Sequence, residues 1–184
     1  MDRRFLVPLF LGIGLVGLCV WRINTNKPQT LSEQLQRARI ERPAENFEGV
    51  DIHNTMFRLE RYLGRHRVLV VFFSALETAA NDPGLLAVRD AFPLLSKNDV
   101  KVVGVSTALP QDNRRAIETA GDFPFPLISD PDESIHRRWS RIDPQTQQPR
   151  SGVFLIDRKG TVATLGGIPQ PAGNVTELLQ ELTR

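Results

Sequence analysis

An uninterrupted apolar run, Val-Leu-Val-Val-Phe-Phe, extends from Val68 to Phe73. A short run rich in Val and Phe predicts a strand that is covered on both faces. Asp82 and Pro83 follow, and they are typical of a helix start with aspartate as N-cap and proline at the first helical position. In α/β proteins, ligands bind where such a strand ends and the helix begins. We therefore expect any functional site near residues 74–83, a segment without cysteine, histidine or paired carboxylates.

The rest of the globular part alternates predicted strands and helices. Val100 to Ser106 predicts a second buried strand, and the helix before it should be kinked or shortened by Pro93. The other predicted elements are two short strands within 50–59, a polar helix over 111–120, an extended segment within 123–130, a short helix over 131–141 with Ile135 and Trp139 buried, a hairpin over 152–165 and a helix opening at Asn174. This order predicts an α/β fold, a mixed sheet with helices on both faces.

Cysteine and histidine usage limits the chemistry that the chain can perform alone. The single cysteine, Cys19, excludes an intramolecular disulfide and a CxxC redox centre. His53, His66 and His136 lie far apart in the sequence and lack the spacing of a zinc site. We therefore expect no metal and no cofactor.

The charge pattern gives no indication of a nucleic-acid partner. The formal net charge is +2, and nucleic-acid binding would require a clustered basic face. Two local basic groups, within 61–67 and 136–141, are interpreted as solvated surfaces.

The N-terminus has the features of an uncleaved membrane anchor. Phe5 to Trp21 is a stretch of 17 residues without a charge, close to the roughly 17–25 residues that span a bilayer as a helix. The first alanine of the chain is Ala38, so the small residues of a signal-peptide cleavage site are missing. We predict a single-pass signal anchor in residues 1–22 that contacts the lipid bilayer through residues 5–21. Arg3 and Arg4 before the anchor favour an extracytoplasmic domain, whereas Arg22 and Lys27 after it favour the opposite orientation. We expect the extracytoplasmic orientation.

Two further segments follow the anchor. Residues 23–46 are expected to form a linker and a short stalk helix, because Thr30 and Glu33 have the spacing of a capping box. Residues 47–184 are expected to form the globular domain.

Several motifs of this domain, taken together, resemble the peroxiredoxin family, the thiol-specific antioxidant branch of the thioredoxin fold. The resemblance covers roughly Phe47 to Leu182. It rests on Gly64 before the Val68 strand, Val102-Val-Gly-Val-Ser106, Phe125-Pro-Leu-Ile-Ser-Asp-Pro131, Val153-Phe-Leu-Ile-Asp157 and Gly160. It implies a thioredoxin-like, peroxiredoxin-type mixed sheet flanked by helices, here with an N-terminal transmembrane helix.

The resemblance also indicates which site residues differ from the family. The family motif is Pro-x-x-x-Thr-x-x-Cys, and the matching positions here are Ser74, Thr78 and Asn81, so only the threonine is retained. Arg150 lies near the position where the family places an arginine, one residue further from Phe154 than the pattern. An asparagine amide has no titratable proton and cannot replace the thiolate that attacks peroxide. The resemblance therefore implies no confident catalytic residue in this chain.

These observations favour a membrane-anchored, peroxiredoxin-like pseudoenzyme. Its expected role is non-catalytic binding or scaffolding, linked to redox or envelope processes, with a protein partner that the sequence does not identify. One alternative is an antioxidant, peroxide-handling oxidoreductase that works with a partner's thiol and holds peroxide between Thr78 and Arg150. Another is a small-molecule or anion site at the helix N-terminus between Asp82 and Leu85, where Glu77 and Asp82 place unfavourable negative charge.

Overall fold

The computed structural model describes residues 42–73 and 78–163, which lie in the compact unit from Ala38 to Arg184. The predicted anchor, the stalk helix, Cys19, Ser74 and the helix expected from Asn174 lie outside these ranges. Within these ranges, no helix is both long and apolar enough to span a bilayer. The anchor therefore remains a prediction from the sequence.

A four-stranded sheet forms the centre of the unit, with strand order β5-β4-β3-β6. Its strands are β3 (Arg67–Phe72), β4 (Val100–Ser106), β5 (Leu127–Ser129) and β6 (Gly152–Ile156). The pairs β3–β4 and β4–β5 are parallel, whereas β6 runs antiparallel to β3. A separate two-stranded sheet joins β1 (Glu48–Val50) and β2 (Met56–Arg58). The predicted mixed sheet and its two buried strands are confirmed.

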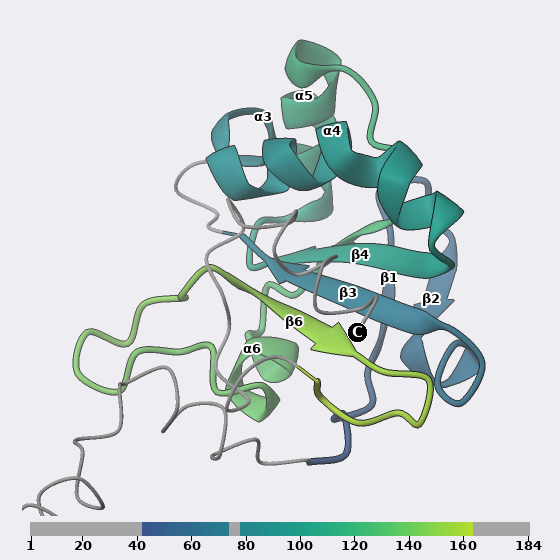
Figure 1. The fold of residues 1–184 in the computed structure, drawn as a ribbon. Coiled ribbons are helices and arrows are strands. Elements are labelled where there is room, and N and C mark those ends of the chain that lie inside the picture. Colours follow the sequence, from purple (N-terminus) through teal and green to yellow (C-terminus); the bar gives the residue numbers. More distant parts are fainter. Residues whose placement is uncertain (1–41, 74–77, 164–184) are drawn as a thin grey trace, which may run out of the picture. The chain divides into compact units, whose positions relative to one another are not determined.

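Helices cover both faces of the main sheet. The helices α3 (Thr78–Asn81), α4 (Pro83–Lys97) and α5 (Pro110–Ala120) lie on one face, and α6 (Ser134–Arg138) lies on the other (Figure 1). A short 3-10 helix, η2 (Leu59–Arg61), follows β2. Alternate residues of β3 serve the two faces, because side chains alternate along a strand. Leu69 and Val71 pack in the core under α4 and α5, and Val68, Val70 and Phe72 pack in the core that includes Trp139 and Phe154.

The start of α4 agrees with the sequence, and of the two effects expected of Pro93, a kink or a shortening, the shortening does not occur. Leu85 N–H donates to the Asp82 carboxylate at 2.8 Å, and Pro83 occupies the first turn. The helix is not shortened at Pro93 and continues to Lys97. A proline removes one helical hydrogen bond, while Leu95 beyond it is buried in the core. The burial of this last turn offsets the lost bond.

Helix α6 is shorter than the predicted 131–141. Glu133 and Ser140 have φ values of 59° and 54°, in the left-handed region that a right-handed helix cannot include. These two residues bound the helix on either side. Ile135 and Trp139 are nevertheless buried, as predicted.

The described part of the predicted 152–165 hairpin is the strand β6, a turn at residues 157–160 and two single bridges. Thr161 forms one bridge with Pro43, and Val162 forms the other with Ile156.

Candidate functional site

Thr78 and Asn81 line one pocket, which has a volume of about 620 Å³. The pocket lies between α3, the loop that follows β4, and α5. It is therefore at the carboxyl-terminal edge of parallel strands, the position expected for a ligand site in an α/β fold. The other lining residues are Ala80, Thr107, Ala108, Leu109, Asp112, Asn113, Arg115, Ala116 and Thr119.

Asn81 presents its amide to solvent at this pocket. Its side chain is exposed and makes no hydrogen bond with any residue that the structure describes. Asn81 does not cap the next helix, because the N-cap of α4 is its neighbour Asp82, whose carboxylate accepts the Leu85 N–H. The same bond occupies the helix terminus that was one alternative anion site. The Asn81 amide is thus free to form hydrogen bonds with a ligand, because it stabilises no element in the described part of the chain.

Thr78 has an unusual backbone conformation. Its φ of 54° lies in the left-handed region, which is disfavoured for a β-branched residue. Its carbonyl oxygen accepts the Asp82 N–H at 3.1 Å, which joins the short helix α3 to the start of α4. The position that matches the family threonine is therefore held at the pocket by a constrained turn.

Arg150 is not among the residues that line this pocket. Its guanidinium donates from Nε to the Asp143 carboxylate at 2.9 Å and also pairs with it through Nη2. Two backbone N–H groups, those of Gln145 and Thr146, donate to the same carboxylate. The Thr146 and Gln145 N–H groups and the Arg150 guanidinium lower the pKa of Asp143 to about 2. Arg150 is thus committed to an ion pair in the 143–150 loop.

The sequence did not indicate the polar residues that α5 contributes to the pocket. Asn113 is buried, and its amide nitrogen donates to Ser129 Oγ at 3.0 Å and to Ser106 Oγ at 3.2 Å. Arg115 and Asp112 are exposed, and Arg115 Nη1 lies 3.8 Å from Asp112 Oδ1. The helical spacing could have indicated that Asn113 is buried. Asn113 lies three residues before Ala116, so both residues share the inner face of the helix.

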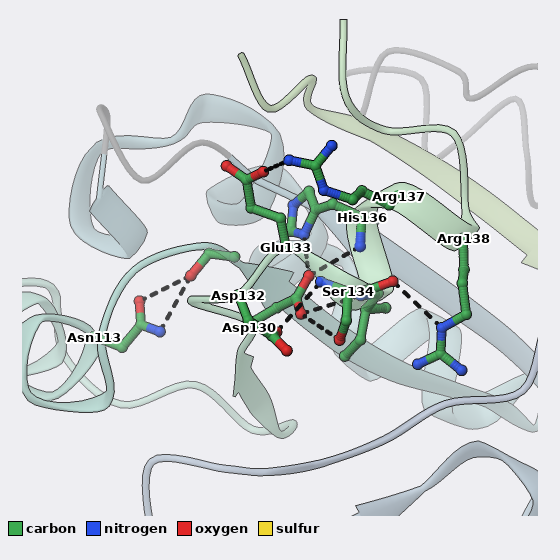
Figure 2. A network of polar contacts seen from close by, with 10 residues as sticks. Asn113, Asp130, Asp132, Glu133, Ser134, His136, Arg137 and Arg138 are labelled. Atoms are coloured by element: carbon green, nitrogen blue, oxygen red, sulfur yellow. Dashed lines mark hydrogen bonds and ion pairs between the residues drawn. The ribbon is translucent and has the colours of Figure 1, made fainter. Parts of the chain in front are cut away.

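A second polar cluster, the Asp130 network, joins the end of β5 to α6, the helix on the sheet face opposite α4 and α5. Figure 2 shows its side chains. The Asp130 carboxylate accepts the backbone N–H groups of Ile135 and His136 at 3.1 and 2.9 Å and contacts His136 Nδ1 at 2.7 Å. Ser134 Oγ donates to it at 3.3 Å. The side chains of His136 and Asp130 are only 0% and 1% exposed, so this aspartate–histidine pair is closed to solvent.

Burial and hydrogen bonding act on the Asp130 pKa in opposite directions. Burial raises it, whereas the hydrogen bonds from the His136 side chain and from the His136 and Ile135 backbone lower it, and the net direction is downward. The carboxylate therefore stays ionised and caps the turn before α6. This pair has the composition of a catalytic dyad, but its burial gives it a structural role.

The interpretation of the 136–141 group as a solvated surface is wrong for two of its members. Arg137 and Arg138 are exposed, but His136 is buried and packs edge-on against Phe72. Arg141 is half-buried, with its guanidinium 5.5 Å from the centre of the Phe154 ring. The sequence shows only a run of basic residues. The short helix α6 and the turn after it determine which of these side chains point into the core and which point to solvent.

The described residues that line the pocket carry groups that can form hydrogen bonds and ion pairs. Its lining residues offer hydroxyl, amide, carboxylate and guanidinium groups but no thiol and no imidazole. A covalent redox step needs an activated nucleophile, which these lining residues do not supply. Among the described residues, no group of three His, Cys, Asp or Glu side chains is arranged to hold a metal ion.

Comparisons with known proteins agree with the fold and with the motifs. A family model described as the AhpC/TSA family matches residues 40–165. PrxU of Peptoclostridium acidaminophilum, a selenocysteine-containing peroxiredoxin, is 29% identical over 133 residues, which cover 68% of this chain and 65% of PrxU. Peroxiredoxin 2 of Drosophila melanogaster is 26% identical over 149 residues, 76% of each chain. The chain thus spans slightly less than two thirds of PrxU.

Solved structures show the same architecture. The reduced 2-Cys peroxiredoxin of Plasmodium vivax superposes with a TM-score of 0.64 at 19% identity, covering 79% of this chain and 96% of that chain. Peroxidoxin BcpB of Mycobacterium tuberculosis gives a TM-score of 0.61 at 20% identity, with 78% and 96% covered. These likenesses confirm the thioredoxin-like, peroxiredoxin-type fold. The family match extends over all described residues, and the chain belongs to the AhpC/TSA family.

Proposed function

We propose that this chain is a degenerate peroxiredoxin-like protein that binds a partner or ligand at the Asn81 pocket and does not reduce peroxide. The observation that carries the proposal is the position of Asn81. An exposed amide stands at an open pocket where the family pattern places the peroxidatic cysteine. The amide can donate and accept hydrogen bonds but cannot form a sulfenic acid.

Peroxide consumption by the full-length chain in detergent tests this proposal. We expect no consumption above buffer for the wild type or for the Cys19→Ser variant, which has no thiol. Turnover that persists in Cys19→Ser would overturn the proposal, because the remaining chain would then reduce peroxide without any cysteine.

A gain-of-function variant examines the pocket itself. We expect Asn81→Cys, made in the Cys19→Ser background, to react with one equivalent of peroxide and form a sulfenic acid at position 81. The matched control is Asn81→Ser, which places a hydroxyl at the same point. An inert Asn81→Cys would show that the pocket no longer holds peroxide in a reactive position.

The alternative function is peroxide reduction with a partner's thiols. The openness of the pocket at Asn81 favours it, since a thiol from outside can reach this point. In that reaction two thiols become a disulfide, and the peroxide becomes an alcohol and water. With an excess of a small thiol, the wild-type chain should then accelerate peroxide loss beyond the rate measured with the thiol alone. If the chain gives no acceleration, this route is excluded for that thiol.

We also propose the membrane anchorage that residues 5–21 indicate, with the domain on the extracytoplasmic side. The length and the lack of charge of this stretch support the proposal. Resistance of the full-length chain to alkaline extraction from membranes, and its loss when residues 5–21 are replaced by a polar sequence, would test it. Protease accessibility from the extracytoplasmic side tests the orientation.

A further inference from the structure

We propose that Arg42 and Arg141 form an oxyanion-binding site beside Phe154, on the sheet face opposite the Asn81 pocket. The ligand class is a phosphate group, either free in solution or in the headgroup of an anionic lipid. The proposal concerns residues outside the Asn81 pocket and is independent of the function proposed for it.

The first step is geometric. The guanidinium carbons of Arg42 and Arg141 lie 5.8 and 5.5 Å from the centre of the same ring, that of Phe154 in β6. Phe154 is buried and also packs against Trp139, so the ring that both guanidinium groups approach is fixed. Two cations thus lie beside one aromatic side chain from the edge strand of the sheet.

The backbone holds each arginine in place. The Arg42 carbonyl accepts the Val162 N–H at 2.9 Å, which ties the start of the described chain to the segment after β6. The Arg141 carbonyl accepts the Arg150 N–H at 2.8 Å, which ties the end of α6 to the segment before β6. The two side chains therefore come from segments that are far apart in sequence and converge on β6 from its two ends.

The second step is the charge balance. Arg150 adds a third positive charge nearby, but its guanidinium is already paired with Asp143. Neither Arg42 nor Arg141 has a carboxylate partner among the residues that the structure describes. Burial lowers the pKa of Arg141, and the charges of Arg150 and Arg42 lower it further, which places the three cations within electrostatic reach of one another. An anion between Arg42 and Arg141 would relieve this repulsion.

The third step concerns an unsatisfied donor. Arg141 Nε is buried and has no hydrogen-bond partner within the described ranges. Buried donors without partners are uncommon in folded proteins and call for an explanation. An oxyanion at the Nη nitrogens of Arg141 would leave the buried Nε as it is, but it would add charge-assisted hydrogen bonds to the same guanidinium group.

The ligand class follows from the shape of guanidinium groups. Arginine presents planar, forked N–H groups that match the oxygen spacing of phosphate in two-point contacts. A singly charged carboxylate provides less negative charge than phosphate between two cations, so we expect a preference for phosphate.

Titration calorimetry of the full-length chain in detergent with inorganic phosphate, and separately with acetate, tests the site. We expect phosphate to bind the wild type at low salt, more weakly at high salt, and more tightly than acetate. The double variant Arg42→Gln/Arg141→Gln should bind at least about tenfold more weakly, because both charge-assisted contacts are lost. The matched control Arg114→Gln removes an exposed arginine on α5 and should bind phosphate as the wild type does.

A second variant is expected to bind phosphate more tightly, so its effect can be distinguished from a loss of binding caused by unfolding. Asp143→Asn removes the carboxylate that neutralises Arg150, and phosphate should then bind about threefold to tenfold more tightly. An increase in affinity cannot arise from loss of structure. Unchanged or weaker phosphate binding in Asp143→Asn, together with unchanged binding in the double variant, would overturn the proposal.

Vesicles distinguish the two sources of phosphate. Wild type and double variant are compared for cosedimentation with phosphatidylcholine vesicles and with equimolar phosphatidylcholine and phosphatidylglycerol vesicles. Salt-sensitive excess binding to the anionic vesicles that is lost in the double variant assigns the site to lipid headgroups. Phosphate binding without such an excess assigns it to a free oxyanion, and the absence of both refutes the site.

Discussion

Asn81 and Asp130 are polar residues that each follow a parallel strand, but the fold treats them in different ways. Asn81 lies on α3, after β3, where its amide is exposed at a large pocket and free of hydrogen bonds within the described ranges. Asp130 comes directly after β5, is buried, and accepts hydrogen bonds from Ser134, Ile135 and His136. Asn81 keeps its amide available at the pocket, while the Asp130 carboxylate uses both of its oxygens for hydrogen bonds that hold the turn before α6.

This difference shows that a close carboxylate–imidazole contact is not by itself a sign of catalysis. Structural ion pairs also shift pKa values, so a perturbed carboxyl group indicates function only when it faces a cleft. The Asp130–His136 pair faces Phe72 and the core. Among the described residues, Thr78 and Asn81 face such a cleft, the pocket beside α5. Four substitutions, ordered from the largest expected effect to the smallest, examine this contrast.

Asp130→Asn should cause the largest loss of stability. It removes the charge that holds His136 and the turn before α6, and breaking a buried pair of this kind costs about 3–5 kcal/mol. Urea unfolding measures the loss. The matched control is Asp132→Asn, for which we expect a loss below about 1 kcal/mol. Asp132 is exposed, and within the described ranges its carboxylate accepts one hydrogen bond, from the Ser134 N–H at 3.3 Å. Similar losses of stability in both variants would show that the buried Asp130 contributes no more than an exposed aspartate.

The stability difference between wild type and Asp130→Asn should depend on pH in a defined direction. The folded-state pKa of Asp130 lies below its ordinary value of 3.8, so its contribution is complete above that value and is lost as the pH falls below it. We therefore expect the stability difference between wild type and Asp130→Asn to shrink as the pH is lowered below about 4. A difference that grows on acidification would contradict this assignment.

Asn113→Ala should have an intermediate effect, since Asn113 belongs both to the pocket lining and to a buried cluster. Its loss leaves Ser106 Oγ without its side-chain partner in a site that is 0% exposed, at a cost of about 1–3 kcal/mol. Asn113→Asp keeps the oxygen that accepts the Ser106 hydroxyl but removes the nitrogen that donates to Ser106 and Ser129, so it tests the donor separately from the acceptor. A loss below about 0.5 kcal/mol for Asn113→Ala would mean that the cluster is solvated.

Asp82→Ala should cost about 1 kcal/mol because it removes the N-cap of α4. Asp82→Asn keeps an oxygen acceptor for the Leu85 N–H and should cost less. Thermal unfolding of the two variants at one pH provides the comparison. Equal losses would show that the negative charge near the helix terminus, and not the hydrogen bond, stabilises the helix.

Asn81→Ala should change stability by less than about 0.5 kcal/mol, as expected for an exposed side chain without partners. The neighbouring Asp82→Ala serves as the positive control, since the two residues are adjacent but have different roles. A cost above about 1 kcal/mol at Asn81 would mean that its amide is a structural group and would weaken the case for a binding role.

Local patterns were sufficient to predict much of the fold. The buried runs at β3 and β4 were visible because strands covered on both faces are continuously apolar. The start of α4 was visible because Asp82 and Pro83 carry its cap and first turn, and Gly121, with φ of 83°, ends α5 as its sequence position indicated. The family resemblance located Thr78 and Asn81, which the structure brings to one pocket.

Other features depended on contacts between distant segments. The bounds of α6 were not predictable because left-handed residues at Glu133 and Ser140 break a helical pattern that continues in the sequence. The continuation of α4 beyond Pro93 depended on the burial of Leu95. The participation of Asn113 in the pocket depended on Ser106 and Ser129, which lie on two other strands.

The sequence by itself determined the order of the strands and helices, the family resemblance and the loss of the family's cysteine at Asn81. These depend on residue identity and on spacing over short distances. Only the tertiary structure decided which polar groups are free and which are consumed. It buried His136 against Phe72, left Asn81 open, and placed Arg42 and Arg141 at one ring. The reason is physical: the availability of a polar group depends on solvent access and on partners that the sequence places far away.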